Sequence, residues 1–319
     1  MTLIPLSGFF QLEQNVPLAI TIVVLSSFLF ASGSTVQHLA VDGTVDVESE
    51  NRSMNLRQVF GLLKNKVWLG GLTMIVIGAS MHICGLALAP VTVVQPVGIL
   101  AVPWSVLLAA KIHHFRPSKM IWGAVALTII GVAAFTYFSA STAAKETVLE
   151  PLPIVVAALV VFGIAAVLGY LGMHGSAARR CLMWASGGAF IYGLSSAMVK
   201  STFEMLGRDQ FWTQPLFYVV LFFLLCSYLF GAWMIQQGYA NGPAEIVVGS
   251  MTTTDPIVAV TFGIIVLGEG ALLTIGDGIG MAISGAVAIS GVVLLSKYHP
   301  EAQSRLRPAA EVPQVEAAE

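Results

Sequence analysis

Long apolar runs separated by short polar segments dominate the hydrophobic pattern of this chain. A helix that crosses a bilayer needs about 20 mostly apolar residues, and none of these runs alternates residue by residue as a membrane β-barrel strand does. We therefore predict an all-α polytopic membrane protein. Its nine transmembrane helices are expected at residues 16–40, 67–89, 90–112, 118–140, 152–173, 181–205, 214–240, 243–267 and 271–295.

The composition points the same way. Hydrophobic residues make up 56% of the 319 residues and charged residues 10%, whereas soluble domains carry roughly 25% charged residues. A net charge of -2 without a basic run gives no reason to expect a nucleic-acid partner. We therefore expect the chain to be surrounded by the lipid bilayer.

The Lys and Arg residues are distributed unevenly between the predicted loops. Twelve of the 15 fall on one side of the membrane in the nine-span arrangement, and such an excess marks the cytoplasmic side. This predicts an extracytoplasmic N-terminus at 1–15, a cytoplasmic loop at 41–66 and a cytoplasmic, disordered tail at 296–319. We expect the protein to lie in a bacterial inner (plasma) membrane.

Two segments that lie five spans apart resemble each other. GASMHICGLALAP (78–90) and GAWMIQQGYANGP (231–243) agree at six of thirteen positions without a gap. An odd offset reverses the direction in which the second copy crosses the membrane, so the pattern predicts two inverted-topology repeats. The first repeat is expected at 16–140 and the second at 181–295, with a connecting helix at 152–173.

Each predicted repeat carries a proline after a polar residue in the span that follows the matched segment. These pairs are Gln95 with Pro96 and Asp255 with Pro256. Prolines in corresponding spans of two repeats point to broken helices and a substrate site near the membrane centre. We therefore predict helix breaks at Pro96 and Pro256, with Gln95 and Asp255 at the substrate-binding or coupling site. For Asp255 the alternative is a helix N-cap, because an aspartate before a proline is also a helix-start pattern.

Four further polar residues in predicted spans are candidates for the same site. Thr253 and Thr254 can line the cavity, or they can hydrogen-bond to their own helix. Gln236 and Gln237 are adjacent, so they face different directions on a helix and at least one should point into the bundle.

His82 and Lys200 are the last two candidates. His82 can serve the site or simply pack within the bundle. Lys200 lies near the end of a span, where it can contact a solute, reach the membrane interface or pair with Glu204 one turn later.

Four stretches together resemble the drug/metabolite transporter (DMT, EamA-like) superfamily, and within it the nine-span branch of NIPA-type magnesium transporters. They are SSFLFASGSTVQH (26–38), WLGGLTMIVIGASMHICGLALAPVTVVQPVGIL (68–100), GLSSAMVKS (193–201) and GYANGPAEIVVGSMTTTDPIVAVTFGIIVLGEG (238–270). The resemblance covers residues from about 16 to 295. It implies two inverted bundles around a central cavity, with alternating access.

The sequence contains no Walker-type phosphate loop, metal triad or GxSxG motif, so we expect neither an enzyme nor a cofactor. The predicted function is secondary-active export or uptake of a small organic metabolite or drug, because one acid among amides, hydroxyls and aromatics suits such a solute. The alternative is a NIPA-type divalent-cation (magnesium) transporter in which Asp255 is the metal ligand. A membrane scaffold or accessory subunit, and the choice between monomer and homodimer, are left open.

Overall fold

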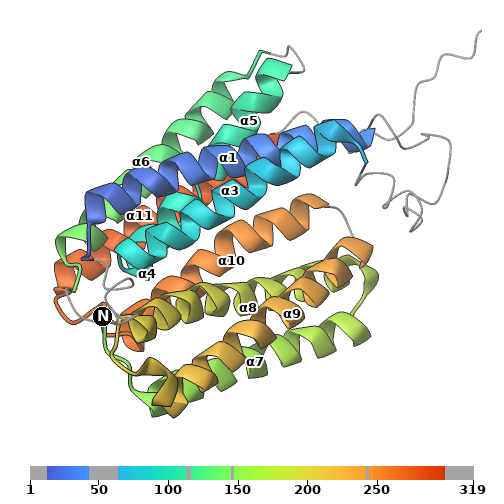
Figure 1. Cartoon of the computed structure of the whole chain (residues 1–319). Helices are drawn as coiled ribbons and strands as arrows, with labels where there is room; N and C mark the ends of the chain where they lie inside the picture. The colour runs from blue at the N-terminus through green and yellow to red at the C-terminus, as the bar shows by residue number, and fades with distance from the viewer. Residues whose placement is uncertain (1–12, 43–63, 113–115, 145–146, 242–243, 299–319) are drawn as a thin grey trace, which may run out of the picture.

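The computed structural model describes residues 13–42, 64–112, 116–144, 147–241 and 244–298, and every regular element in these ranges is a helix (Figure 1). Within this part of the chain, nine helical segments are long and apolar enough to cross a membrane. Most of the predicted N-terminal segment 1–15, loop 41–66 and tail 296–319 lie outside the described residues.

The helices lie close to the predicted spans, and for the described residues they confirm an all-helical chain with nine helices long and apolar enough to cross a membrane. Each boundary falls within four residues of its expected place, and α8 and α11 deviate most. The elements are α1 (Val16–Asp42), α3 (Lys66–Leu88), α4 (Val91–Gly98), α5 (Ala101–Ile112), α6 (Lys119–Ser141), α7 (Pro151–His174), α8 (Ala177–Leu206), the 3-10 helix η2 (Phe211–Thr213), α9 (Pro215–Asn241), α10 (Ala244–Ile265) and α11 (Ile275–Tyr298).

Polar residues at the edges of apolar runs determine where α3 and α6 begin. Asn65 Oδ1 accepts hydrogen bonds from the backbone N–H groups of Val67 (2.9 Å) and Trp68 (3.3 Å). Ser118 Oγ accepts the N–H of Ile121 at 3.3 Å. These side chains satisfy amides that have no partner in the first helical turn.

Three helix pairs run side by side: α1 with α3, α8 with α9, and α6 with α11 (Figure 1). Small residues allow the first pair to approach closely. A Cβ atom at Gly33 would lie 2.6 Å from the Gly71 carbonyl oxygen, and one at Gly71 would lie 2.8 Å from the Gly33 carbonyl oxygen. The two backbones can touch here only because both positions lack a side chain, which is a common way for helices to associate in lipid.

The buried centre of the molecule joins α4 to α8 and α10. Figure 1 shows α10 between the α1–α3 pair and the α8–α9 pair. Since α4 belongs to the first half of the chain and the other two helices to the second half, the two halves meet at this core. Its buried side chains include Val91, Val93, Val94, Val97, Leu194, Met198, Val258, Ala259 and Phe262.

The third span is interrupted, but the eighth is continuous. α4 contains Pro96 and ends at Gly98, and α5 begins at Ala101. In contrast, α10 continues through Pro256. The predicted helix break at Pro256 is therefore wrong, and the break in the third span lies at 99–100, after Pro96 rather than at it.

A second proline accounts for this difference. Proline has no N–H group and cannot donate to the carbonyl four residues earlier in a helix. Pro96 and Pro103 both fall in the third span, and the carbonyl of Ile99, four residues before Pro103, accepts the N–H of Val102 at 3.0 Å instead. Pro256 is the one proline within α10, and the helix keeps its path around a single missing hydrogen bond.

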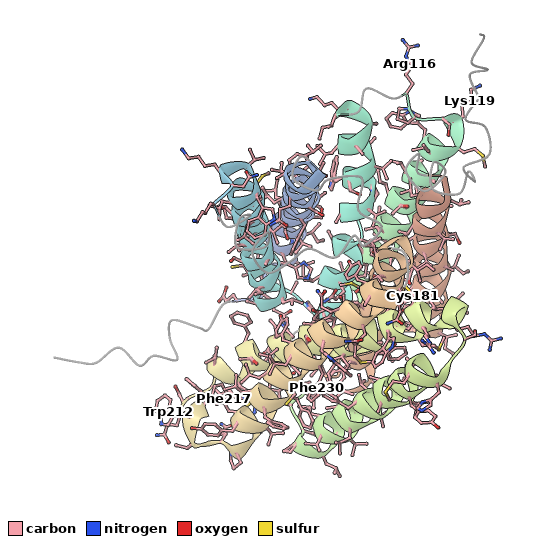
Figure 2. All side chains as sticks on the ribbon, turned by 90° about the vertical axis from the view of Figure 1, so that its right-hand side faces the viewer. Arg116, Lys119, Cys181, Trp212, Phe217 and Phe230 are labelled. Atoms are coloured by element: carbon pink, nitrogen blue, oxygen red, sulfur yellow. The ribbon has the colours of Figure 1, made fainter. Side chains whose placement is uncertain are left out.

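Aromatic side chains gather where α9 begins. The Phe211 ring contacts the rings of Trp212 and Phe217, with centroid distances of 5.1 and 4.9 Å. Figure 2 shows Trp212 and Phe217 together at this end of the α8–α9 pair, and Cys181 at the other end. Such clusters are typical of the membrane interface, where aromatic rings lie at headgroup level.

Candidate functional site

A cavity of about 510 Å³ lies where the interrupted third span meets α10. This volume is within the roughly 300–1,000 Å³ range of ligand pockets. Three predicted site residues from three helices line it: His82 on α3, Gln95 on α4 and Asp255 on α10. We call it the Asp255 cavity. Its other polar lining residues include Ser26, Ser27, Ser34, Ser105, Ser196, Tyr239 and Thr252.

Gln95 and Asp255 bring buried polar atoms without partners to this cavity. Gln95 is only 5% exposed, and neither its Nε2 nor Asp255 Oδ1 has a hydrogen-bond partner within the described parts of the chain. An unsatisfied buried donor or acceptor costs about 1–3 kcal/mol. The two atoms have opposite needs, because the amide nitrogen requires an acceptor and the carboxylate oxygen requires a donor. A ligand with both kinds of group would satisfy them together.

Close packing between α8 and α10 holds Asp255 in its position at the cavity. A Cβ atom at Gly193 on α8 would lie 2.7 Å from the Asp255 carbonyl oxygen and 2.7 Å from Val258 Cβ. The glycine therefore allows the α10 backbone to lie directly against α8. This contact fixes the part of α10 that carries the carboxylate.

His82 adds an imidazole to the same cavity. Its ring lies beside Gly98, the last residue of α4, where a Cβ atom would be 3.3 Å from His82 Cε1. A neutral imidazole donates from one ring nitrogen and accepts at the other. His82 can therefore satisfy either a donor or an acceptor of a bound ligand.

Four serine hydroxyls of the wall, those of Ser26, Ser27, Ser105 and Ser196, donate to backbone carbonyls. Ser26 Oγ donates to the Gly78 carbonyl at 2.7 Å, and Ser105 Oγ donates to the Val102 carbonyl at 2.8 Å. A hydroxyl that donates once keeps its lone pairs for accepting. These oxygens therefore favour a ligand that carries hydrogen-bond donors.

Two of the three threonines before Asp255 hydrogen-bond to their own helix. The hydroxyls of Thr252 and Thr253 donate to the carbonyls four residues earlier, at 2.7 and 2.8 Å. Thr252 lines the Asp255 cavity, Thr253 lines a neighbouring cavity, and Thr254 lines neither. The structure therefore does not bring Thr253 and Thr254 to the Asp255 cavity.

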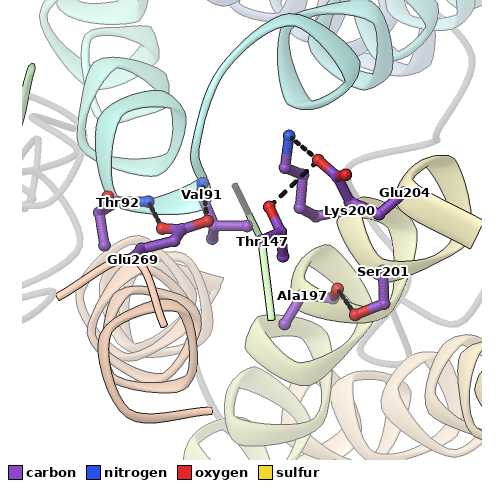
Figure 3. Close-up of polar contacts among 8 residues, drawn as sticks. All are labelled: Val91, Thr92, Thr147, Ala197, Lys200, Ser201, Glu204 and Glu269. Carbon is purple, nitrogen blue, oxygen red and sulfur yellow. Dashed lines mark hydrogen bonds and ion pairs between the residues drawn. The ribbon is translucent and has the colours of Figure 1, made fainter. Parts of the chain in front are cut away.

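Gln236, Gln237 and Lys200 also lie away from the cavity. Gln236 is exposed on α9 and Gln237 is half-buried, and neither lines the cavity. Lys200 is 0% exposed. Its Nζ lies 2.9 Å from Glu204 Oε1, and the Thr147 hydroxyl donates to the same oxygen at 3.1 Å (Figure 3). Lys200 and Glu204 form an ion pair, but Lys200 Nζ has no hydrogen-bond partner among the described residues.

Glu269 was not among the predicted site residues, yet it joins the two halves of the protein. Its Oε1 accepts the N–H of Val91 and its Oε2 accepts the N–H of Thr92, both at 2.8 Å (Figure 3). Glu269 follows α10 and is 3% exposed, while Val91 and Thr92 are the first residues of α4. A carboxylate at this position satisfies amides without helical partners and faces the positive end of the helix dipole.

The surroundings of Glu269 act on its ionisation in opposite directions. Burial raises the pKa of its carboxyl above the ordinary value of 4.5. The hydrogen bonds from Thr92 and Val91, and the positive charge of Lys200, lower the pKa but do not cancel the effect of burial. The LGE sequence at 267–269 shows an acidic residue after the eighth span, but it does not indicate the partner of that residue, which lies 178 residues away.

Comparisons with known proteins identify similarity but no function. No protein-family model matches the chain, and no solved structure matches it. The chain is 21% identical over 290 residues to an uncharacterized protein of Corynebacterium glutamicum, an alignment that covers 89% of this chain and 96% of that protein. The part of the chain that the structure describes has the features of an integral membrane protein, with nine apolar helices and a polar cavity among them.

Proposed function

We propose that this protein is a membrane transporter that moves a small organic solute through the Asp255 cavity by alternating access. The observation that carries this proposal is the presence of Gln95 Nε2 and Asp255 Oδ1, both buried and without partners among the described residues, in one cavity. Polar and ionisable groups at membrane depth are costly, and they commonly mark solute pathways.

The two ends of the helix bundle differ in a way that supports alternating access. At the end where α4 begins, Glu269 binds the first amides of α4, and the Val148 N–H donates to the Leu267 carbonyl at 2.9 Å. The cavity extends toward the other end, where Ser34 and Ser105 line it. Transporters of this kind seal one end while the other admits the solute.

The neighbours of each helix support the proposed inverted repeat. The α1–α3 pair of the first half corresponds to the α8–α9 pair of the second half, and α6 pairs with its expected counterpart α11. The third span, made of α4 and α5, corresponds to α10. Gln95 thus lies on a short helix and Asp255 on a long one, so the two halves are unequal at the site.

An organic solute suits this cavity better than magnesium does. The wall combines a carboxylate, an amide, an imidazole, hydroxyls and a phenol. Magnesium is usually bound through one or two carboxylates while it keeps several waters, and the described residues contain no group of three His, Cys, Asp or Glu that could hold a metal ion. Magnesium is our second candidate, because the unpartnered Asp255 carboxylate could still bind a hydrated ion.

Flux measurements in proteoliposomes test the proposal. A panel of organic amines is followed by mass spectrometry and magnesium by an indicator dye, for the wild type and for Asp255→Asn and Gln95→Leu. We expect flux of at least one amine, and a reduction of roughly tenfold or more in each variant, as the loss of a hydrogen bond to a charged or buried group implies. Gln236→Leu, which replaces an exposed glutamine outside the cavity, should retain wild-type flux.

Two other results would lead to different conclusions. Magnesium flux that Asp255→Ala abolishes, without amine flux, would favour the second candidate. No flux of any compound under any gradient would contradict a transport function and favour a scaffold or accessory subunit.

We also propose that the N-terminus is extracytoplasmic and the C-terminus cytoplasmic in a bacterial inner membrane. The support is the excess of Lys and Arg on one side of the nine spans. A reporter fused after Glu319 should be active only in the cytoplasm, and activity outside the cell would reverse this orientation.

A further inference from the structure

A second cavity, of about 480 Å³, adjoins the Asp255 cavity. It lies between α10 and α11, with α6 behind them, and we call it the α10–α11 groove. Its lining is almost entirely apolar and includes Phe135, Ile257, Val260, Ile264, Met281 and Ile289. Its volume also falls in the roughly 300–1,000 Å³ range of ligand pockets.

The two cavities share lining residues at the interruption of the third span. Ile99, between α4 and α5, and Pro256 on α10 line both of them. Different faces of α10 line the two cavities. Thr252 and Asp255, three residues apart and therefore on one helix face, line the polar cavity, whereas Thr253 and Ile257 line the groove.

The groove also reaches the outer surface of the bundle. Ile257 is 52% exposed, and Ala282 and Ala286 on α11 are exposed as well. In a bilayer this surface faces acyl chains. An apolar group therefore has favourable surroundings both in the groove and in the adjacent lipid. A polar head in the same position would instead need the hydrogen-bonding groups of the Asp255 cavity.

We propose that the solute is an amphiphile whose polar head occupies the Asp255 cavity and whose apolar chain passes Ile99 and Pro256 into the α10–α11 groove. The head carries a hydrogen-bond donor, such as an ammonium group, for Asp255 and an acceptor, such as a carbonyl, for Gln95 Nε2. This inference rests on the proposed function and deepens it, because it names the class of substrate.

Gly278 offers a way to fill the groove without disturbing the fold. It lines the groove at the start of α11, and a Cβ atom there would meet nothing within 4 Å. Gly123 on α6 is a matched control, because a Cβ atom there would also meet nothing within 4 Å and the residue lines neither cavity. A leucine at either position should be accommodated, but only the one at 278 should occupy space meant for a ligand.

The test measures binding of N-acetylethylenediamine and N-decanoylethylenediamine to the protein in nanodiscs by calorimetry, with empty nanodiscs subtracted. Both compounds have the same amide and ammonium groups and differ only in the chain. Asp255→Asn should weaken the binding of both by roughly tenfold or more. Gly278→Leu should weaken binding of the decanoyl compound by about tenfold, the usual scale of overpacking, and leave binding of the acetyl compound unchanged. Gly123→Leu should change the binding of neither compound.

Three outcomes would overturn the inference. If Gly278→Leu leaves decanoyl binding unchanged while binding of both compounds still depends on Asp255, the proposal of an amphiphilic substrate is wrong but the proposed transport site stands. If decanoyl binding responds to Gly278→Leu but not to Asp255→Asn, the groove holds an independent lipid. If neither compound binds the wild type and Asp255→Asn has no effect on flux, the transport site and the inference fail together.

Discussion

Glu269 accepts the backbone N–H of Val91 at 2.8 Å, and this contact links the α10–α11 connection to the first residue of α4. Its second carboxylate oxygen binds the next amide in the same way. A single side chain from the second half of the protein thus caps the short helix that carries Gln95.

Replacing Glu269 with alanine should destabilise the protein. The change removes both acceptors and leaves two buried amides without partners, at a cost of about 1–3 kcal/mol each. The measurement is the thermal unfolding midpoint in detergent. Glu150→Ala is the control, since Glu150 is exposed at the start of α7 and makes no side-chain cap hydrogen bond. Equal midpoints for the two variants would show that the Glu269 cap contributes nothing.

The stability contribution of Glu269 should depend on pH in a defined direction. Because burial raises the pKa of this carboxyl above 4.5, the folded state keeps the proton over a pH range in which the unfolded state has lost it. The contribution is therefore full below pH 4.5 and is lost as the pH rises through the raised pKa. The midpoint of the wild type, measured relative to that of Glu269→Gln, should fall over this range and then level off. A difference that stays constant with pH would contradict the prediction.

The Lys200–Glu204 pair should respond unequally to removal of either partner. Lys200 is fully buried, whereas the Glu204 side chain is 30% exposed. Glu204→Gln removes the ion-pair partner of a buried cation and should cost about 3 kcal/mol, in line with broken buried ion pairs. Lys200→Met leaves only a partly hydrated carboxylate, so its effect should be much smaller.

The double variant Lys200→Met with Glu204→Gln provides the control for this pair. It removes both charges, and its unfolding midpoint should recover most of the loss seen in Glu204→Gln. If the double variant is no more stable than Glu204→Gln, the cost does not come from the buried charge.

Two adjacent glycines on α3 should differ sharply in their tolerance of a side chain. A Cβ atom at Gly71 would clash with Gln37 Cγ and the Gly33 carbonyl oxygen, both at 2.8 Å, whereas one at Gly70 would meet nothing within 4 Å. Gly71→Leu should therefore destabilise the protein by about 1–3 kcal/mol or more. Gly70→Leu should leave the unfolding midpoint near that of the wild type. Similar midpoints for both variants would mean that α1 and α3 do not pack as described.

The spans were predictable from sequence because a single physical requirement, about 20 apolar residues per crossing, determines them. Capping residues such as Asn65 and Ser118 then place helix starts near the ends of the apolar runs. The fate of a proline was less predictable. Pro256 looked like Pro96 in isolation, but the outcome in the third span depends on a second proline at 103.

The site was predictable only in part. Gln95 and Asp255 were recognised because a polar residue before a proline is unusual inside an apolar run, and the structure places both in one cavity with His82. Gln236 gave an equally strong polar signal but faces outward, because adjacent residues on a helix cannot all point inward. Glu269 depends on a contact across 178 residues, which no local pattern reveals.

The short length of α4 has a mechanical consequence. Gln95 lies four residues after Val91, or about 6 Å along the axis at 1.5 Å per residue, and the far end of α4 joins α5 through turn-type backbone hydrogen bonds such as Leu100 N–H to the Val97 carbonyl (3.1 Å). α4 is therefore a short, buried link between the Asp255 cavity and the Glu269 cap. We therefore expect a ligand that binds Gln95 to act on the Glu269 contact through α4 itself, because both lie on the same eight-residue helix.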